Sequence, residues 1–128
     1  MSTSPTAIMV TFSAPSATAT EEDFNEWYDR HHVPEILEHV SGIARVTRYQ
    51  LDQAQMGSQV DDALPYAAIY EFDKPVDEVL REFAAAQPKL TMSDTLDTSE
   101  RVPVTRIYEF LGAASRTSEI SSAASVRR

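Results

Sequence analysis

The sequence predicts an α+β protein with one ferredoxin-like domain, in which two helices cover one face of an antiparallel sheet. The length of 128 residues suits a single domain, and the expected elements follow the order strand, helix, strand, strand, helix, strand. The first and last strands show little polar alternation, which is typical of strands that are covered on both faces. Because the chain has no further layer to supply, we expect a second copy to cover the open face about a two-fold axis.

The first strand and the first helix are expected before residue 40. Residues 7–12 form a nearly continuous apolar run, which predicts a buried strand. Thr20 can cap the helix that follows, with Asp23 as an approximate capping-box partner. Apolar positions continue the helical period to about His39. Pro34 is expected to kink this helix or to begin a second helical piece.

Two strands are expected after the glycine that ends the first helix. Gly42 is predicted to adopt the left-handed conformation that closes helices. Residues 43–51 alternate with a period of two, and residues 66–72 are apolar and aromatic, so both read as strands. Residues 52–65 are expected to form a long loop between these strands. This loop either covers a pocket as a lid or is simply exposed to solvent.

The last two elements complete the domain. Residues 74–86 place apolar side chains on one face of a helix, and residues 102–111 predict the last strand. The domain is therefore expected over residues 7–112, with a flexible N-terminus at 1–6. Residues 113–128 are rich in serine and alanine, and we expect a flexible tail there.

Composition excludes several classes of function. The formal charge of −9 repels phosphate backbones and anionic membrane surfaces, so neither nucleic acid nor a membrane is an expected partner. No apolar run approaches the roughly 20 residues of a membrane span. The absence of cysteine and of a signal-peptide pattern makes a cytoplasmic location the default expectation. Motifs for nucleotide phosphates, serine hydrolysis and zinc proteolysis are absent, which leaves proton transfer on an apolar substrate or simple binding.

One stretch resembles a known family. Residues 24–34 read FNEWYDRHHVP, and Gly42 and the pair Arg48-Tyr49 follow. This pattern resembles the EthD-like branch of the dimeric α+β barrel superfamily. The resemblance implies a homodimer with a pocket in each subunit between the sheet and its helices. The superfamily includes cofactor-free monooxygenases, polyketide cyclases, lactone isomerases, dehydratases, decarboxylases and haem-degrading enzymes, so the resemblance fixes no reaction.

The histidines near the end of the first helix are the candidate catalytic residues. The branch has one histidine two residues before the proline, and His32 occupies that place. A pKa of about 6.5 suits proton transfer near neutrality, and Asp29 could fix the tautomer of His32. His31 is the second candidate, but consecutive helical residues lie about 100° apart, so at most one of the two faces the interior squarely. The alternative is that His32 only packs or caps the helix end.

Aromatic residues and one arginine are the candidate contacts to substrate. Trp27 precedes His31 by four residues, and Tyr28 precedes His32 by four, so each histidine has an aromatic ring one turn behind it. Tyr108 shares a strand face with Arg106, and this pair could orient a carbonyl or a phenolate. The alternatives are core packing for the tyrosines and a salt bridge for Arg106. The candidate substrate contacts are Trp27, Tyr28, Tyr49, Arg106 and Tyr108.

These observations favour a cofactor-independent enzyme of the lyase, isomerase, cyclase or dehydratase type. His32 would transfer a proton on a hydrophobic, oxygen-bearing small molecule, in catabolism or polyketide-type metabolism. No metal is expected, because His32 and His39 lie about 10.5 Å apart along a straight helix. The alternatives are a non-catalytic ligand-binding or accessory protein of an oxidation system, and a cofactor-free or haem-dependent monooxygenase with His31 or His32 as the haem ligand.

Overall fold

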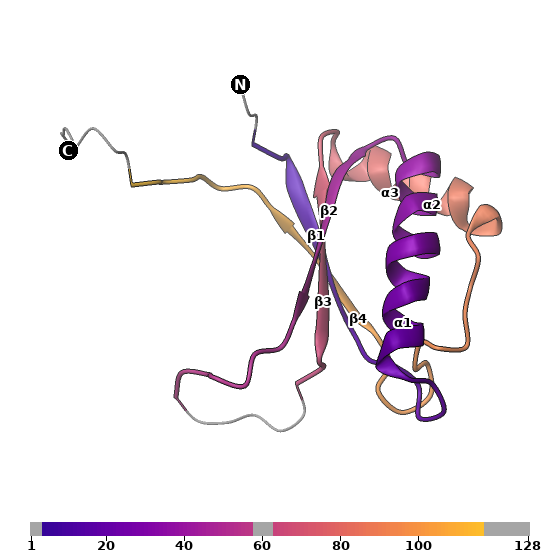
Figure 1. The fold of residues 1–128 in the computed structure, drawn as a ribbon. Coiled ribbons are helices and arrows are strands. Elements are labelled where there is room, and N and C mark those ends of the chain that lie inside the picture. Colours follow the sequence, from indigo (N-terminus) through magenta and orange to yellow (C-terminus); the bar gives the residue numbers. More distant parts are fainter. Residues whose placement is uncertain (1–3, 58–62, 117–128) are drawn as a thin grey trace.

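In the computed structural model of this protein, residues 4–57 and 63–116 are described. Four strands form one sheet in the order β2-β3-β1-β4, and each neighbouring pair is antiparallel. Helical elements cover one face of the sheet, and no described residue covers the other (Figure 1). The strands are β1 (Ala7–Ser13), β2 (Ile43–Gln50), β3 (Tyr66–Phe72) and β4 (Val104–Glu109). The helical elements are α1 (Glu21–Trp27), η1 (Tyr28–His32), α2 (Val33–His39), α3 (Val76–Ala86) and η2 (Gln87–Lys89).

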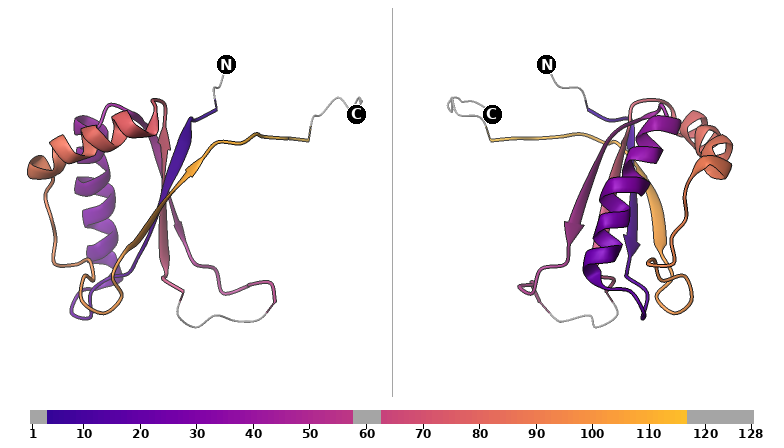
Figure 2. Two further views of the ribbon diagram at one scale, coloured as in Figure 1. Left: turned by 180° about the vertical axis from the view of Figure 1, so that it is seen from behind. Right: turned by 45° about the vertical axis from the view of Figure 1, so that its right-hand side comes forward.

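The predicted ferredoxin-like order of elements is confirmed. The first three strands match their predicted ranges to within one residue at each end, whereas β4 is two residues shorter at both ends than predicted. The two views of Figure 2 show the helices on one side of the twisted sheet. In the part of the chain that the structure describes, no helix is both long and apolar enough to cross a membrane.

The first helix runs from Glu21 to His39 through a π-helical turn. The Thr20 side chain caps it as predicted, because its Oγ1 accepts a hydrogen bond from the Asp23 N–H at 3.0 Å. The turn η1 interrupts the α-helical pattern, and the Val33 N–H donates to the carbonyl of Tyr28, five residues earlier. Because α2 begins at Val33, Pro34 lies in the first turn of a second helical piece, where its missing N–H is tolerated.

Gly42 is required for a reason other than the predicted one. Among the described glycines only Gly57 has a positive φ, of +72°, so the predicted left-handed conformation of Gly42 is wrong. A Cβ atom at Gly42 would instead lie 2.7 Å from Cγ2 of Val79 and 3.0 Å from Oε1 of Glu82. The Gly42 N–H also donates to this Oε1 at 2.7 Å. Glycine therefore allows the turn before β2 to pack closely against α3.

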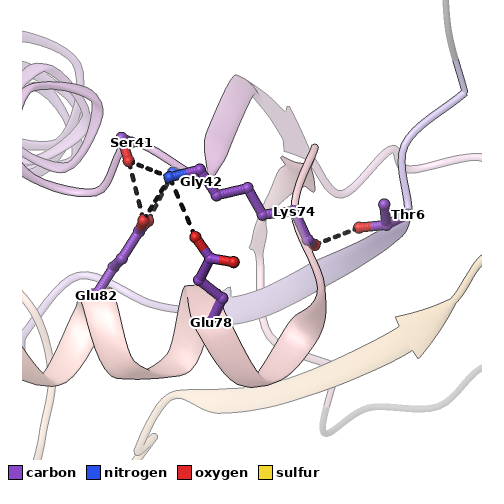
Figure 3. Close-up of polar contacts among 6 residues, drawn as sticks. All are labelled: Thr6, Ser41, Gly42, Lys74, Glu78 and Glu82. Carbon is purple, nitrogen blue, oxygen red and sulfur yellow. Dashed lines mark hydrogen bonds and ion pairs between the residues drawn. The ribbon is translucent and has the colours of Figure 1, made fainter.

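A polar cluster joins the turn before β2 to α3 (Figure 3). Nζ of Lys74 lies 2.7 Å from both Oγ of Ser41 and Oε2 of Glu82, and 3.5 Å from a carboxylate oxygen of Glu78. The hydrogen bond from Lys74 is the largest cause that holds the pKa of Glu82 below its usual value. Oγ1 of Thr6 donates to the carbonyl of Lys74 at 2.7 Å. The cluster therefore also fixes the chain before β1.

The core lies between the helices and one face of the sheet. Along β3, alternate residues are buried against the helices, and these are Tyr66, Ala68, Tyr70 and Phe72. The register pairs Tyr70 with Met9 of β1, so the same face of β1 points to the helices. The opposite face carries the large apolar side chains of Phe12, Tyr49, Val104 and Tyr108, which are all exposed in the single chain.

Parts of three predicted segments fall outside the described residues. Residues 1–3 belong to the predicted flexible N-terminus, and residues 58–62 belong to the predicted lid loop. Residues 117–128 make up most of the predicted flexible tail. The expectations for these three stretches remain predictions.

Candidate functional site

A cavity of about 200 Å³ lies between the helix-facing side of the sheet and the helical elements. Its wall is mainly apolar, and the large apolar side chains include Met9, Trp27, Ile36, Phe83, Leu90 and Leu96. The polar side chains in the wall include Thr11, Ser13, Tyr28, His32, Tyr70 and Thr105. A cavity of about 150 Å³ is enough to hold one benzene molecule. This space, which we call the His32 cavity, therefore suits a single small substituted ring.

The π turn brings three aromatic rings to the wall of the His32 cavity. The rings of Trp27 and His32 are stacked, with centroids 4.7 Å apart and an angle of 24° between their planes. The ring of Tyr28 meets His32 edge to face, at 5.0 Å and 83°. A regular α-helix would place Trp27 behind His31, as the sequence spacing predicts. The π turn instead brings the residue five positions on, His32, over the indole ring.

His32 is largely buried and is neutral at neutral pH. Burial lowers its pKa from 6.5 to about 4, the carboxylate of Glu35 opposes this shift, and the charge of Arg48 adds to it. Its Nδ1 atom is enclosed and has no hydrogen-bond partner among the described residues. His31, in contrast, is exposed and is not part of the cavity wall. Of the two histidines, only His32 is placed to meet a ligand in this cavity.

The expected contact between Asp29 and His32 is not made. Oδ1 of Asp29 accepts a hydrogen bond from Nη1 of Arg48 at 2.9 Å, and Asp29 is absent from the cavity wall. The guanidinium of Arg48 lies over the ring of Tyr28, with 4.2 Å between its Cζ atom and the ring centroid. Asp29 therefore fixes the arginine that packs on Tyr28 and does not fix the imidazole.

Two tyrosine hydroxyls form a buried pair in the cavity wall. The hydroxyl oxygens of Tyr28 and Tyr70 are 3.3 Å apart and share a hydrogen bond. Burial raises the pKa of both phenols, so both are protonated at neutral pH. Tyr70 is not among the site residues predicted from the sequence, because a tyrosine on a strand is typical of core packing. The alternation along β3, which places Tyr70 on the helix-facing side, is the signal that could have identified it.

The segment between η2 and β4 forms the outer wall of the His32 cavity. The backbone N–H and the hydroxyl of Thr91 each donate to the carboxylate of Glu35, both at 2.7 Å. The indole Nε1–H of Trp27 donates to the carbonyl of Thr91 at 3.3 Å. Further along, Asp97 accepts backbone hydrogen bonds that hold its pKa well below the usual value. This wall is therefore fastened to the helix that carries His32.

Three of the predicted substrate contacts lie on the other face of the sheet. The register pairs Tyr108 with Ile8, and Tyr49 with Ala67, on the face away from the helices. Arg106 shares that face, and its Nη1 donates to the carbonyl of Thr105 in its own strand at 2.8 Å. Tyr49, Arg106 and Tyr108 are therefore separated from His32 by the sheet, and none of them lines the His32 cavity.

The His32 cavity does not fit a haem. A volume of about 200 Å³ is close to that of a single ring site and far below the space that a porphyrin needs. Within residues 4–57 and 63–116, no three acidic or histidine side chains gather into a potential metal site.

The comparisons with known proteins identify the fold. No protein-family model and no curated protein matches the chain. The crystal structure of an Arabidopsis thaliana protein is similar at a TM-score of 0.64 and 9% identity, covering 84% of this chain and 98% of that one. Its solution structure gives a TM-score of 0.56 at 11% identity, covering 88% and 93%. An EthD-like protein from Ralstonia eutropha is similar at a TM-score of 0.50 and 16% identity, covering 88% and 98%.

These identities are low, so the likeness concerns the fold. The order of strands and helices is ferredoxin-like, and the similarity extends over nearly the whole length of each matched structure. The predicted resemblance to EthD-like proteins is therefore confirmed at the level of the fold.

Proposed function

We propose that the protein is a small cofactor-independent enzyme in which His32 transfers a proton on a hydrophobic, oxygen-bearing molecule. One observation carries the proposal: a largely buried, neutral imidazole lines a mainly apolar cavity beside tyrosine hydroxyls. The reaction class is that of a lyase, isomerase, cyclase or dehydratase, because these reactions proceed by moving protons on a bound substrate.

His32 is suited to act as a base on a bound molecule. Because Nδ1 is enclosed, Nε2 is the ring nitrogen that a bound molecule can reach. When Nδ1 carries the ring proton, Nε2 presents a lone pair that can accept a proton from carbon or oxygen. The resulting imidazolium is disfavoured by burial, which is why the pKa of the free site is low. A negative charge that develops on the substrate at the same time offsets this cost, because opposite charges at close range attract each other, and more strongly at lower dielectric.

The tyrosine pair is suited to stabilise that negative charge. The two hydroxyls of Tyr28 and Tyr70 carry two hydrogens, and the bond between them uses one. The second hydrogen is available to a carbonyl or phenolic oxygen of a ligand. Hydrogen bonds from fixed donors to a developing oxyanion are among the largest single contributions to enzyme catalysis.

Hydrogen–deuterium exchange tests the proposal without knowledge of the physiological substrate. The probe is 2-indanone, a small cyclic ketone whose α-protons exchange with D₂O when a base removes them. We expect saturable acceleration by the wild-type protein and its loss in His32→Gln. His31→Gln is the matched control, because His31 is exposed and outside the cavity wall. Unchanged exchange in His32→Gln would refute the catalytic role.

A non-catalytic binding protein is the second candidate. The observation that favours it is that no carboxylate among the described residues orients the His32 ring, since Asp29 pairs with Arg48. In that case 2-indanone would bind saturably and change the fluorescence of Trp27, the only tryptophan of the chain. The rate of deuterium exchange would then equal that of the buffer.

We also propose that the functional unit is a homodimer that buries the open sheet face. Tyr49 and Tyr108 are each 55% exposed on this face in the single chain, and Phe12 and Val104 lie beside them. An apolar sheet face of this kind is typical of an interface. Light scattering should show twice the monomer mass of 14.3 kDa for the wild type and a monomer for Val104→Glu. A stable wild-type monomer at micromolar concentration would contradict the proposal.

A further inference from the structure

Arg48 is a largely buried cation directly behind the site. Its side chain is 14% exposed, and its Nε and Nη2 atoms have no hydrogen-bond partner within the described part of the chain. The guanidinium lies over the ring of Tyr28 at 4.2 Å and near that of Tyr66 at 5.5 Å. Stacking on aromatic faces replaces part of the hydration that burial removes from the cation.

The charge of Arg48 is only partly neutralised. Its one ion-pair partner among residues 4–57 and 63–116 is Asp29, and the Asp29 side chain is 58% exposed, so water screens the carboxylate more than the guanidinium. A positive field therefore remains at the ring of Tyr28. Arg48 does not line the His32 cavity, whereas Tyr28 does. The cation consequently acts on a ligand through the tyrosine that it holds.

The directions of the pKa shifts in the cavity wall agree with this geometry. Burial is the largest influence on the pKa of each titratable group in the wall, raising the pKa of Tyr28 and Tyr70 and lowering that of His32. The charge of Arg48 lowers the pKa of all three. In all three groups, the charge of Arg48 therefore favours the form with one proton fewer.

The charged groups near His32 come from three elements. Glu35 of α2 raises the pKa of His32 but is engaged by two hydrogen bonds from Thr91. Asp29, on the same π turn as His32, is engaged by Arg48. Arg48 of β2 is therefore the charge on the sheet side of the site.

We infer that the His32 cavity binds the oxygen of its ligand as an anion, a phenolate or an enolate, and that Arg48 is the positioning residue that selects this form. Arg48 holds the Tyr28 ring so that the Tyr28–Tyr70 pair donates to the anionic oxygen, and its charge stabilises that oxygen at a distance. Asp29 clamps Arg48 in this position. The inference rests on the proposed function for the location of the ligand and goes beyond it in naming the charge state of the ligand.

The probe for this inference is 4-nitrophenol, a single substituted ring that titrates near neutrality and whose phenol and phenolate absorb at different wavelengths. At a pH where the free probe is mostly phenol, binding to the wild type should increase the phenolate absorption. Arg48→Met should bind the phenolate roughly tenfold more weakly or worse, because a buried charge acts at low dielectric. Arg48→Lys keeps the charge and should restore part of the effect. A wild type that fails to bind the probe, or binds it as neutral phenol, overturns the inference.

A second measurement needs no ligand and separates a charge effect from a loss of structure. The pH dependence of Trp27 fluorescence reports protonation of His32, because the stacked imidazolium quenches the indole. We expect Arg48→Met to raise the pKa of His32, and Asp29→Asn to lower it, because Asp29→Asn leaves Arg48 without its counter-charge. Damaged packing alone would not move the two variants in opposite directions, and equal pKa values in both would overturn the inference. Exchange of 2-indanone tests the proposed function separately, since it can persist when 4-nitrophenol binds as neutral phenol.

Discussion

Replacing His32 with glutamine is expected to make the folded protein less sensitive to acid. The pKa of His32 is about 4 in the folded protein, against 6.5 for an ordinary exposed histidine, because burial disfavours the imidazolium. Between these values the unfolded chain binds a proton that the folded protein does not bind. The free energy of unfolding therefore falls as the pH drops below about 6.5, and this loss is complete below about pH 4.

The size of the effect follows from the two pKa values of His32. At about 1.4 kcal/mol per pKa unit, the gap between 6.5 and about 4 corresponds to about 3.5 kcal/mol in total. At about pH 5 the expected loss is about 2 kcal/mol relative to neutral pH. Glutamine does not titrate, so His32→Gln should lack this loss and keep only the pH dependence that the other groups cause.

Urea unfolding followed by circular dichroism, at pH 7 and pH 5 and at one protein concentration, measures this difference. The wild type should lose about 2 kcal/mol more than His32→Gln on going to pH 5. His31→Gln is the matched control and should follow the wild type, because His31 is exposed. Equal pH dependence of the wild type and His32→Gln would refute the conclusion that His32 is buried as a neutral base.

Three further changes test other parts of the structure. Gly42→Ala should cost roughly 1–3 kcal/mol of unfolding free energy, because the new Cβ would lie 2.7 Å from a methyl group of α3. Gly112→Ala is the control, because a Cβ there meets nothing within 4 Å, and equal melting temperatures of the two variants would contradict this prediction. Glu35→Gln should speed hydrogen exchange at the amide of Thr91, because this amide donates to Glu35 at 2.7 Å. Unchanged protection of the amide would show that contacts other than the one with Glu35 hold the outer wall of the cavity. Tyr70→Phe should slow exchange of 2-indanone at least tenfold through loss of a hydroxyl from the donor pair, and full activity would exclude that pair from the chemistry.

The elements of the fold could be predicted because their signals are local. The alternation over Tyr66–Phe72 gives both the strand and its buried side, and Thr20 marks the start of the first helix. Gly42 shows the limit of such signals. The sequence indicates that a glycine is needed at this turn, but the close approach of Val79 that requires it comes from an element almost forty residues away.

The candidate site could be predicted only in part, for two physical reasons. The spacing of Trp27, Tyr28 and His32 pointed to the correct helix, but the π turn changes which rings meet, and nothing in the spacing indicates it. The partner of Asp29 is Arg48, nineteen residues away on β2, so a contact of the tertiary structure replaces the local contact expected with His32.

The two faces of the sheet explain why some of the predicted substrate contacts do not line the His32 cavity. The sequence placed Arg106 and Tyr108 on one face of the last strand, and the register agrees with that. Which of the two faces the helices cover is decided by how the strands pair, and the pairing places Tyr49 on the open face as well. These side chains are therefore candidates for contact with a second subunit and not with a ligand beside His32.

The tautomer and the ligand contact of His32 can be observed directly by nitrogen-15 NMR of the histidine rings. The chain has three histidines, and His32→Gln identifies the signals of His32 by their loss. At neutral pH we expect a neutral ring with an unprotonated Nε2, whose signal moves when 2-indanone is added while that of His31 stays in place. A cationic His32 ring at neutral pH, or an Nε2 signal that does not respond to 2-indanone, would contradict the central claim that this atom is a free base facing the ligand.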